Sequence, residues 1–434
     1  MGGRGSVRVA RMGANVADAV TLADVEAARE RIASLVRRTP MWPTHSLSER
    51  FGGSLLLKCE NLQRTGSFKL RGAANFLAVA EAAGRVARGG GVVAASAGNH
   101  AQGVALAASA RGLRATVVMP ADAPLAKREA TAGYGASVEL VDGPLALAIE
   151  RARALAAERG ELFVPPFDDP AVVAGQGTLG LELLEQAPEL ETVLVPAGGG
   201  GLLAGVALAV TSRAPQVRVV GVQTAAMPGI VESLRAGEAR AVPAARTIAD
   251  GVAVAGPSAL TLGLVQRYVD DVVTVSEEAI AAAVVLLLER TRLVVEGAGA
   301  LGVAALLAGA AAPRGRTVVV LSGGNIDVNL LDRIVERGLL SEGRRRRVTI
   351  AAANVPGELA RVTQAVASAR ANIIEVLHEL VVAELPVGVA RVTLRLELAG
   401  DAAFAELRAA LLAAGLVAGT VTDFATPAAA AAGR

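Results

Sequence analysis

Lys69 is the residue of this 434-residue chain whose surroundings best suit covalent chemistry. It lies in the sequence Ser-Phe-Lys-Leu-Arg-Gly, between apolar neighbours, where a helix is expected to begin. Partial desolvation of an ammonium group lowers its pKa and favours the neutral amine that attacks an aldehyde. The alternative is an ordinary surface lysine at a helix start. Lys69 alone does not distinguish the two.

A run of four glycines and a leucine indicates a phosphate site. The residues are Gly198, Gly199, Gly200, Gly201 and Leu202. They follow an expected strand at residues 192–196 and begin an expected helix. Without Cβ atoms, successive backbone N–H groups can converge on one phosphate. A simple turn would need one or two glycines, and the Gly-Lys-Ser/Thr sequence of an ATP-binding loop does not follow.

Two more strand ends carry small or polar residues suited to a ligand. After the expected strand Gly91–Ala95 come Ser96, Ala97, Gly98, Asn99 and His100, and Ser322 follows the expected strand Arg316–Leu321. A helix that starts at Asn99 offers free N–H groups to an anion, and a hydroxyl can bind a heterocyclic nitrogen. Alternatively, Asn99 and Ser322 are helix caps and His100 is a packed histidine. Together with Lys69 and the glycine run, these strand ends predict pyridoxal phosphate.

A competing signal is the sequence Gly-Ala-Gly-Ala-Leu-Gly at residues 297–302, which matches the dinucleotide-binding pattern G-x-G-x-x-G. The next expected strand ends in Leu321 and Ser322, without the acidic residue that would bind a ribose. A nicotinamide oxidoreductase is therefore the second enzymatic hypothesis. The non-enzymatic hypothesis is a catalytically silent amino-acid-binding protein, against which the retained Lys69 and glycine run argue.

The elements that must position these residues alternate as strand and helix. The expected strands are Gly91–Ala95, 115–119, 192–196, 217–223 and Arg316–Leu321, and the expected helices are 99–111, 125–134, Leu145–Arg159 and 276–290. Short apolar strands between helices are typical of parallel strands covered on both faces. We predict a three-layer α/β domain of two open α/β subdomains over residues 21–340, with the smaller subdomain at about residues 55–160.

The pattern changes after residues 341–347, which contain four consecutive arginines and are expected to form a linker. A strand at 348–353, a helix, strands at 373–383 and 387–398, a helix at 402–412 and a strand at 417–424 follow. This βαββαβ order predicts a ferredoxin-like domain over residues 348–425. Residues 1–20 and 426–434 are expected to be unstructured tails.

Composition excludes several classes of protein. The 43 basic and 41 acidic residues nearly balance, so nucleic acid and membrane surfaces are not expected partners. The uncharged runs at 89–110 and 192–212 are interrupted by glycines and polar residues, which argues against membrane-spanning helices. The single cysteine, Cys59, fits a cytoplasmic protein. His45 and His378 are far from His100 in sequence, so we expect no metal site built on histidine.

The sequence resembles the threonine dehydratases (threonine ammonia-lyases) of the fold type II pyridoxal-phosphate enzymes. The similarity covers about residues 21–340, and its motifs occur in the family's order. They are KCENLQRTGSFK at 58–69, SAGNHAQG at 96–103, PAGGGGLLAG at 196–205, IADGVAV at 248–254, EGAGA at 296–300 and SGGN at 322–325. The resemblance implies elimination of water and ammonia from threonine, giving 2-oxobutanoate, with serine as a further substrate giving pyruvate.

The resemblance also implies a role for each site residue. Lys69 would hold the cofactor as a Schiff base and act as the catalytic base, with Phe68 beside it. Asn99 would bind the cofactor's ring oxygen, and Ser322 would face its pyridine nitrogen. The phosphate would be bound by Gly198, Gly199, Gly200, Gly201 and Leu202. The substrate carboxylate would be surrounded by Ser96, Ala97, Gly98 and His100.

Two departures separate this chain from the related serine racemases, which are the alternative within the family. Racemases carry a serine where Ala97 stands, and alanine cannot donate a proton. They also carry an acidic metal ligand where Gln223 stands, so no metal is expected. The Asn-Pro-x-x-Ser-Val-Lys pattern of the related sulfhydrylases is absent. These differences favour a dehydratase.

The C-terminal region resembles an ACT-type regulatory domain. The sequence NVPGEL at 354–359 is similar to the first turn of such domains, and Ala-Asn-Ile at 371–373 to the entry of their second strand. This implies isoleucine or valine as an effector and a homodimer or homotetramer. The alternative is a module that serves only dimerisation. His378, Glu379 and Leu380 depart from the His-Asp/Glu-Arg sequence of many relatives, which leaves feedback regulation open.

Overall fold

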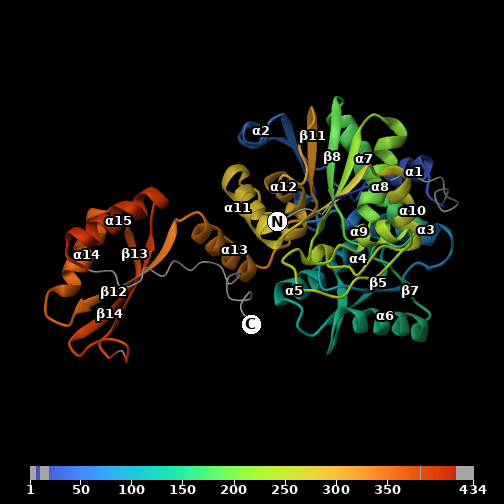
Figure 1. Ribbon diagram of the computed structural model, residues 1–434. Helices are drawn as coiled ribbons and strands as arrows, with labels where there is room; N and C mark the ends of the chain where they lie inside the picture. The colour runs from blue at the N-terminus through green and yellow to red at the C-terminus, as the bar shows by residue number, and fades with distance from the viewer. Residues whose placement is uncertain (1–5, 10–18, 382, 417–434) are drawn as a thin grey trace. The chain divides into compact units, whose positions relative to one another are not determined.

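The computed structural model describes residues 6–9, 19–381 and 383–416 (Figure 1). The chain divides into two compact units, Met1–Leu330 and Leu331–Arg434. Each unit has its own hydrophobic core. None of the helices in the described ranges is long and apolar enough to cross a membrane.

The larger sheet of the first unit has seven strands in the order β1-β10-β9-β8-β11-β3-β2. They are β1 (Ser6–Arg8), β2 (Met41–Pro43), β3 (Ser54–Cys59), β8 (Leu190–Pro196), β9 (Arg218–Thr224), β10 (Asp271–Val275) and β11 (Arg316–Leu321). The strands from β10 to β3 pair in parallel, whereas β1 and β2 pair antiparallel at the two edges. The carboxyl ends of the parallel strands therefore lie on one edge of the sheet.

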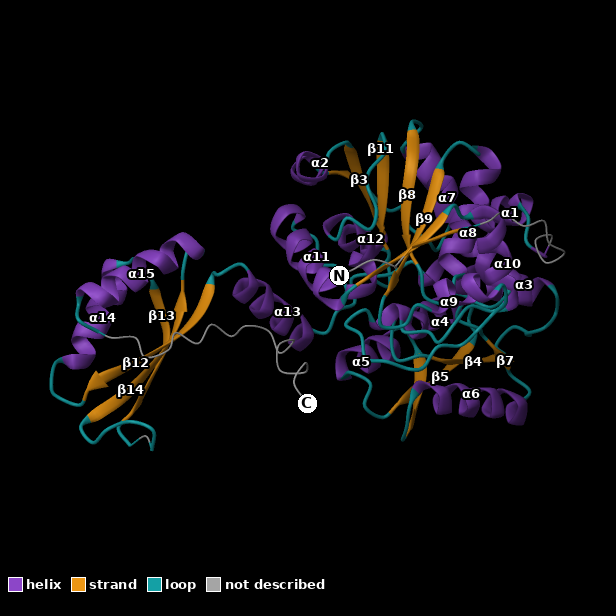
Figure 2. Ribbon diagram, in the orientation of Figure 1, coloured by secondary structure: helices purple, strands orange, loops and turns teal. Residues whose placement is uncertain are grey.

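Helices cover both faces of this sheet (Figure 2). The buried side chains of Val318 and Val320 pack into the core that contains α7 (Pro170–Gln186) and α8 (Gly201–Arg213). Val319, between them, points the opposite way, toward α12 (Gly297–Leu307). Five further helices belong to this part of the chain: α1 (Leu22–Ile32), α2 (His45–Phe51), α9 (Gly229–Ala236), α10 (Ala259–Tyr268) and α11 (Glu277–Thr291). The result is a three-layer arrangement.

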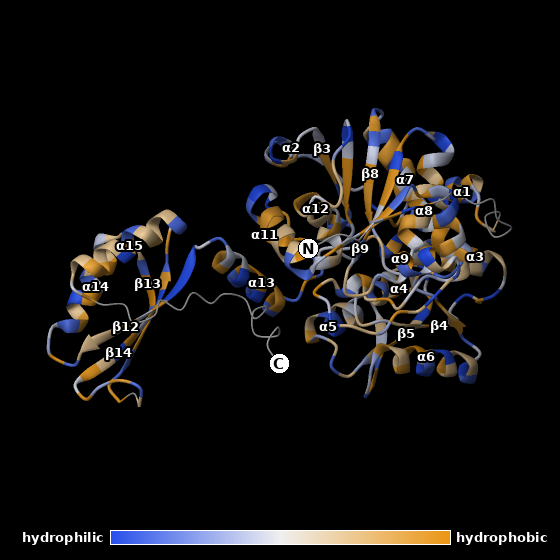
Figure 3. Ribbon diagram, in the orientation of Figure 1, coloured by the Kyte–Doolittle hydropathy of each residue, from blue (hydrophilic) through white to orange (hydrophobic). Residues whose placement is uncertain are grey.

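A second, four-stranded parallel sheet has the order β6-β5-β4-β7. Its strands are β4 (Gly91–Ala95), β5 (Arg114–Pro120), β6 (Ala136–Val141) and β7 (Leu162–Phe163). The helices around it are α3 (Lys69–Ala82), α4 (Asn99–Ser109), α5 (Leu125–Gly133) and α6 (Leu145–Arg159). Ala94 packs with Phe76 of α3 on one face, and Val93 packs with Leu155 of α6 on the other. Helix α6 shows both hydrophobic and hydrophilic residues in Figure 3, as a helix with one buried face should.

The second unit contains an antiparallel sheet of order β12-β14-β13. Its elements are β12 (Arg345–Ala353), α14 (Glu358–Ser368), β13 (Asn372–Glu379), β14 (Val389–Glu397) and α15 (Asp401–Ala413), preceded by α13 (Val328–Ser341). Alternate residues of β14 are buried, and those such as Leu394 pack against Val362 of α14 and Leu407 of α15. The described order is βαββα, and the strand expected at 417–424 lies outside the described residues.

The three-layer α/β prediction is confirmed, and most expected elements lie within two residues of their observed ends. Several expectations about boundaries differ from the structure. The first compact unit ends at Leu330, where residue 340 was expected, and strand β13 ends at Glu379, where residue 383 was expected. Ser6–Arg8 forms an edge strand that pairs with β10, although residues 1–20 were expected to be unstructured. Strand β3 pairs with β11 in the larger sheet, so the smaller subdomain does not begin at residue 55. Strand β12 begins at Arg345, because the arginine side chains of this strand remain at least partly exposed while its backbone pairs with β14.

Candidate active site

Lys69 is the first residue of α3, at the end of a loop that follows β3. Its Nζ donates a hydrogen bond to the carbonyl oxygen of Pro166 at 3.0 Å and lies 5.3 Å from the centroid of the Phe68 ring. Burial lowers the pKa of Lys69 to about 8, although the Glu296 carboxylate opposes this shift. Lys69 therefore supplies neutral amine at much lower pH than an exposed lysine does.

The chain has three lysines, and they differ in their partners. Lys58 is fully buried and pairs with Glu182 at 2.6 Å, and Lys127 pairs with Asp250. Within the described part of the chain, Lys69 makes no ion pair, and its acceptor is a neutral carbonyl. A carboxylate partner stabilises an ammonium ion and withholds its lone pair. Lys69 is thus the lysine best suited to attack an aldehyde.

Backbone hydrogen bonds join the lysine segment to the end of β11. The Phe68 N–H donates to the carbonyl oxygen of Ser322 at 3.1 Å, and the Gly324 N–H donates to the carbonyl oxygen of Gly66 at 2.9 Å. Ser322 is buried, with 2% of its surface exposed. Two motifs about 250 residues apart in sequence, the SGGN and KCENLQRTGSFK segments, thereby meet at one point.

Asn99, at the start of α4, lies in a chain of side-chain amides. Its Nδ2 donates to Glu296 Oε1 at 2.7 Å, and its Oδ1 accepts a hydrogen bond from Asn325 Nδ2 at 2.8 Å. The same Asn325 Nδ2 donates to the carbonyl oxygen of Thr65 at 2.7 Å. These contacts bring the predicted residue Asn99 to the lysine and SGGN segments.

Glu296 is a residue of this site that sequence reasoning missed. It is 2% exposed, and the absence of a side chain at Gly323 makes room for its carboxylate, since a Cβ there would lie 2.2 Å from Oε1. Burial and the neighbouring Asp250 carboxylate raise the pKa of Glu296 to about 7. A carboxylate between apolar Val295 and Gly297 was the available signal.

The glycine run forms a closely packed loop between β8 and α8. A Cβ on Gly198 would lie 2.9 Å from Val252, and one on Gly199 would lie 2.6 Å from the Phe167 ring. Gly200 has a φ of +92°, which favours glycine. Within the described residues, no backbone hydrogen bond is donated by the N–H of Gly198, Gly199 or Gly200. Donors without acceptors at a helix N-terminus suit a phosphate.

The loop after β7 contacts three of the predicted clusters. The Val164 carbonyl oxygen accepts a hydrogen bond from His100 Nε2 at 3.0 Å, and the next contact is that of Pro166 with Lys69. The Phe167 ring then lies against the glycine run. This loop was not among the predicted site residues, although the end of a parallel strand is where ligands of α/β proteins bind.

The segment before α4 is arranged as a small-residue turn. Ser96 Oγ accepts a hydrogen bond from the Gly98 N–H at 3.1 Å, and Ala97 and Gly98 remain partly exposed. Burial and the nearby Lys69 lower the pKa of His100 to about 3, so the imidazole is neutral. Because a carbonyl oxygen only accepts, His100 Nε2 carries the proton that it donates to Val164. This supports the packed alternative for His100 over a general base.

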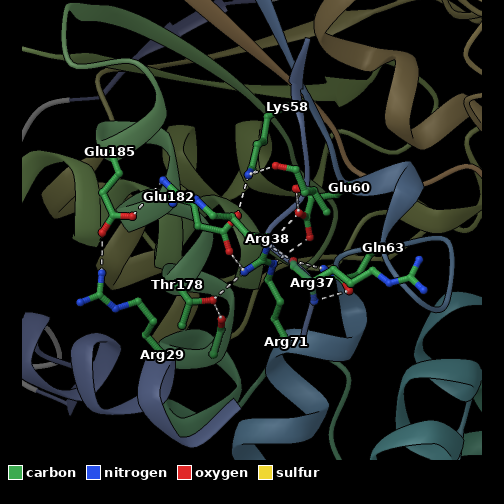
Figure 4. A network of polar contacts seen from close by, with 12 residues as sticks. Arg29, Arg37, Arg38, Lys58, Glu60, Gln63, Arg71, Thr178, Glu182 and Glu185 are labelled. Carbon is green, nitrogen blue, oxygen red and sulfur yellow. Dashed lines mark hydrogen bonds and ion pairs between the residues drawn. The ribbon is translucent and has the colours of Figure 1, made fainter. Parts of the chain in front are cut away.

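Behind Lys69, α3 is anchored by a buried ionic network (Figure 4). Arg71 donates to both oxygens of Glu60 at 2.8 Å and to Glu182 at 2.7 Å. Glu182 also accepts from Lys58, and Thr178 lies 3.1 Å from Arg71 Nη1. Burial alone would raise the pKa of Glu60, but the Arg71 guanidinium holds it below its ordinary value. The network fixes the first turn of α3 against α7.

The motif at 297–302 has a packing role in the structure. A Cβ on Gly297 would lie 2.4 Å from the carbonyl oxygen of Ile248, and one on Gly299 would lie 2.5 Å from that of Gly323. Gly302 is similarly close to Val319. Protein backbone and side chains therefore occupy the space beside these glycines. Moreover, Glu296, the residue before the helix, places a carboxyl group at the N-terminus that would have to bind a pyrophosphate. These contacts count against the oxidoreductase hypothesis.

The described residues fit pyridoxal phosphate. A lysine without a carboxylate partner suits the aldehyde, and the N–H groups of the glycine run suit the phosphate. Among the described residues, Asn99 donates only one of its two amide N–H groups, and Ser322 is a buried residue with a hydroxyl at the end of a strand. Hydrogen bonds and close contacts connect all four predicted clusters.

The packing of the glycine run leads to a prediction about cofactor affinity. Gly199→Ala is expected to weaken pyridoxal-phosphate binding by about 10- to 100-fold, because overpacking against Phe167 costs about 1–3 kcal/mol. Absorbance titration of the cofactor-free protein measures this affinity. Gly133→Ala, with no atom within 4 Å of the added Cβ, is the matched control and should bind normally. Equal affinities for the two variants would contradict the placement of the phosphate at this loop.

The lowered pKa of Lys69 leads to a prediction about pH. Only the neutral amine attacks the aldehyde, so the rate of cofactor capture should rise with pH and level off above about pH 8. An exposed lysine would continue to gain reactivity up to its ordinary pKa of 10.5. Stopped-flow absorbance of the cofactor-free protein mixed with pyridoxal phosphate measures the profile. A midpoint near 10.5 would show that the amine is not desolvated.

Comparisons with known proteins agree with the geometry. Residues 32–323 match the family described as pyridoxal-phosphate dependent enzymes. The chain is 46% identical over 396 residues to an L-threonine ammonia-lyase of Thermotoga maritima, covering 91% of this chain and 98% of that protein. A crystal structure of a T.th. threonine deaminase is 46% identical, with a TM-score of 0.66, over 71% of this chain and 99% of that one.

A serine racemase of known structure is also similar. The maize enzyme is 35% identical, with a TM-score of 0.69, over 74% of this chain and 98% of that one. The family match spans more than half of the chain and includes Lys69, Asn99, the glycine run and Ser322. The protein therefore belongs to the pyridoxal-phosphate dependent enzymes and has their type II fold.

Proposed function

We propose that this protein is a threonine ammonia-lyase that converts L-threonine to 2-oxobutanoate and ammonia. The observation that carries the proposal is 46% identity to an L-threonine ammonia-lyase across 91% of the chain. Lys69, which has a lowered pKa and no carboxylate partner among the described residues, is the base that such a reaction needs. Serine, which lacks only the methyl group of threonine, is a further substrate in this proposal.

The chain's own residues account for binding and proton transfer. When bound, pyridoxal phosphate supplies an electron sink for the charge left at the substrate α-carbon. The N–H groups of the glycine run would hold the phosphate, and the N-terminus of α4, with Ser96 and Gly98, would hold the substrate carboxylate. In this proposal Lys69 Nζ accepts the α-proton, and its lowered pKa leaves a larger share of the amine neutral than an exposed lysine would have at the same pH.

Racemisation is disfavoured by two residues. A racemase needs an acid on the opposite side of the substrate, and Ala97 has no proton to donate. Gln223 does not act as a free ligand either, because its Oε1 accepts hydrogen bonds from the N–H groups of Ile230 and Val231 at 3.1 Å each. Its side chain thereby caps α9. These residues support elimination over racemisation for this chain, although a serine racemase is among its structural relatives.

Incubation of the purified protein with L-threonine tests the proposed reaction. Mass spectrometry should detect 2-oxobutanoate, an ammonia assay should detect an equal amount of ammonia, and chiral chromatography should detect no D-allothreonine, the product of inversion at the α-carbon. Conversion of serine but not of threonine would contradict the substrate assignment. Formation of D-amino acid at a rate similar to that of the oxo acid would favour a racemase.

We also propose that the second unit is an ACT-type domain that binds isoleucine or valine, and that the enzyme is a cytoplasmic homodimer or homotetramer. The described βαββα order, with α14 and α15 packed on one sheet, supports a ferredoxin-like unit. Isothermal titration of the full chain with each amino acid tests effector binding. Release of heat, together with changed threonine turnover, is expected. No heat with either amino acid would leave assembly as the domain's role.

A further inference from the structure

Asn99 is held by hydrogen bonds on both sides of its side-chain amide. We propose that Glu296 and Asn325 are positioning residues that fix the orientation of this amide and so determine which group it offers to the cofactor. This inference rests on the proposed function, in which Asn99 binds the cofactor's ring oxygen. It assigns roles to two residues that were not among the predicted site residues.

The backbone of Thr65 fixes the orientation of the Asn325 side chain. A carbonyl oxygen can only accept, so the group of Asn325 that lies 2.7 Å from it must be the amide Nδ2. The second hydrogen of the same Nδ2 is donated to Asn99 Oδ1 at 2.8 Å. Both hydrogens of Asn325 are then used, and its orientation is fixed by the main chain of the lysine segment.

Glu296 lies at the other end of this series of hydrogen-bonded side chains. Asn99 Nδ2 donates one hydrogen to Glu296 Oε1 at 2.7 Å. Rotation of the Asn99 amide by half a turn would place its oxygen against a carboxyl oxygen and its nitrogen against the Asn325 donor. The two amide nitrogens would then face each other, and the ionised Glu296 carboxylate would repel the amide oxygen, in place of two hydrogen bonds. Asn99 therefore keeps one orientation, with one N–H left for a ligand.

The consequence concerns the ligand atom that Asn99 can bind. A single available N–H accepts no proton, so the matching ligand atom must be a hydrogen-bond acceptor. A deprotonated ring oxygen satisfies this condition better than a hydroxyl, because a charged acceptor forms the stronger hydrogen bond. Glu296 and Asn325 thus favour the ionised form of the cofactor's ring oxygen without touching the reacting atoms.

The charges around Glu296 are mixed. Lys127 and Lys69 contribute positive charge, Asp250 contributes negative charge, and Asn99 donates a hydrogen bond. Since the pKa of Glu296 is raised to about 7, its carboxyl group gains negative charge as the pH rises through neutrality. Negative charge near the Lys69–cofactor linkage favours the protonated form of that linkage. Glu296 should therefore raise the pH at which the linkage loses its proton.

A double-mutant cycle on cofactor affinity tests the proposal. The single variants Glu296→Ala and Asn325→Ala in the full chain should each weaken pyridoxal-phosphate binding by about tenfold, measured by absorbance titration. In an Asn99→Ala background, the same two substitutions should change the affinity by less than about twofold, because they act through the Asn99 amide. Undiminished tenfold effects in that background would overturn the proposal.

A second measurement uses Glu296→Gln, which keeps the shape and the acceptor oxygen but removes the charge. Its cofactor affinity should stay within about threefold of the parent protein, while the pH midpoint of the visible absorbance band should fall. Glu277→Gln, another carboxyl-to-amide change at a helix start but without contact to Asn99, should leave both unchanged. An unchanged midpoint in Glu296→Gln would overturn the inference that the charge of Glu296 favours the protonated form of the Lys69–cofactor linkage. Threonine turnover by the parent protein tests the proposed function separately.

Discussion

Lys69→Ala is expected to abolish the release of ammonia from threonine, with a fall in kcat of at least about 10²–10⁴-fold. In the proposed reaction, the substitution removes both the covalent attachment point of the cofactor and the base that accepts the α-proton. The chain has no other lysine that could replace it, because Lys58 and Lys127 are held by carboxylates. A coupled assay of 2-oxobutanoate formation measures the loss.

Lys69→Arg separates charge from chemistry. Arginine keeps the positive charge and the aliphatic stem but is not deprotonated at accessible pH, so this variant should be as inactive as Lys69→Ala. Both variants should remain folded, because the Lys69 side chain donates a single hydrogen bond within the described ranges, to the carbonyl oxygen of Pro166. Circular dichroism verifies folding. Activity within about tenfold of the parent protein in either variant would refute the role of Lys69 as the base.

The second large effect concerns stability. Arg71→Met should lower the free energy of unfolding by about 3–5 kcal/mol, because it leaves Glu60 as a buried charge without its guanidinium partner. Loss of the ion pair between Arg71 and Glu182 should lower the free energy of unfolding further. Urea denaturation followed by circular dichroism measures the change. The first turn of α3 should loosen as well, since Arg71 lies two residues after Lys69 in that helix.

Arg29→Met is the matched control for this prediction. Arg29 also pairs with a glutamate of α7, Glu185, at 2.6 Å, but its side chain is 42% exposed (Figure 4). An exposed ion pair contributes at most about 1 kcal/mol, so the control should unfold almost as the parent protein does. Similar losses in the free energy of unfolding for Arg29→Met and Arg71→Met would show that burial does not make the Arg71 ion pairs more important for stability.

Many strands and helices of the first unit could be predicted, because the sequence patterns that indicate them are local. Each short apolar strand precedes a glycine-rich or polar turn and then a helix, so the expected ends of Gly91–Ala95, Arg316–Leu321 and Leu145–Arg159 agree with the observed elements. In parallel sheets, such turns share one edge. The glycine run and Ser322, which follow neighbouring strands of the larger sheet, could therefore be expected to lie together, whereas the turn after Gly91–Ala95 belongs to the second sheet.

Contacts between distant segments could not be predicted in the same way. Strand β3 lies beside β11, more than 250 residues later in the chain, because its apolar side chains complete the larger sheet. Nothing within Ser54–Cys59 reveals that partner. The short strand Ser6–Arg8 has an even weaker signal, since three residues show no periodicity. The positions of both strands are set by their pairing with strands that are distant in sequence.

Residues that act through other residues were also hidden. Glu296 stands next to a run of glycines that suggested a dinucleotide site, and only its contact with Asn99 reveals another use. Asn325 ends a recognised motif, but its position between Thr65 and Asn99 depends on three segments that are distant in sequence. A sequence pattern identifies groups at strand ends, whereas the order of donors and acceptors among them requires the fold.

The scarcity of lysine gives this enzyme a practical property. Of its three side-chain amines, one is sealed inside the protein and one is engaged by Asp250, which leaves Lys69 as the readily modified one. Among the lysines, an amine-selective reagent added in limited amount should therefore label Lys69 first, and a bound cofactor should protect it. The extent of labelling, read by peptide mass spectrometry, would report the fraction of empty active sites in a preparation without any assay of turnover.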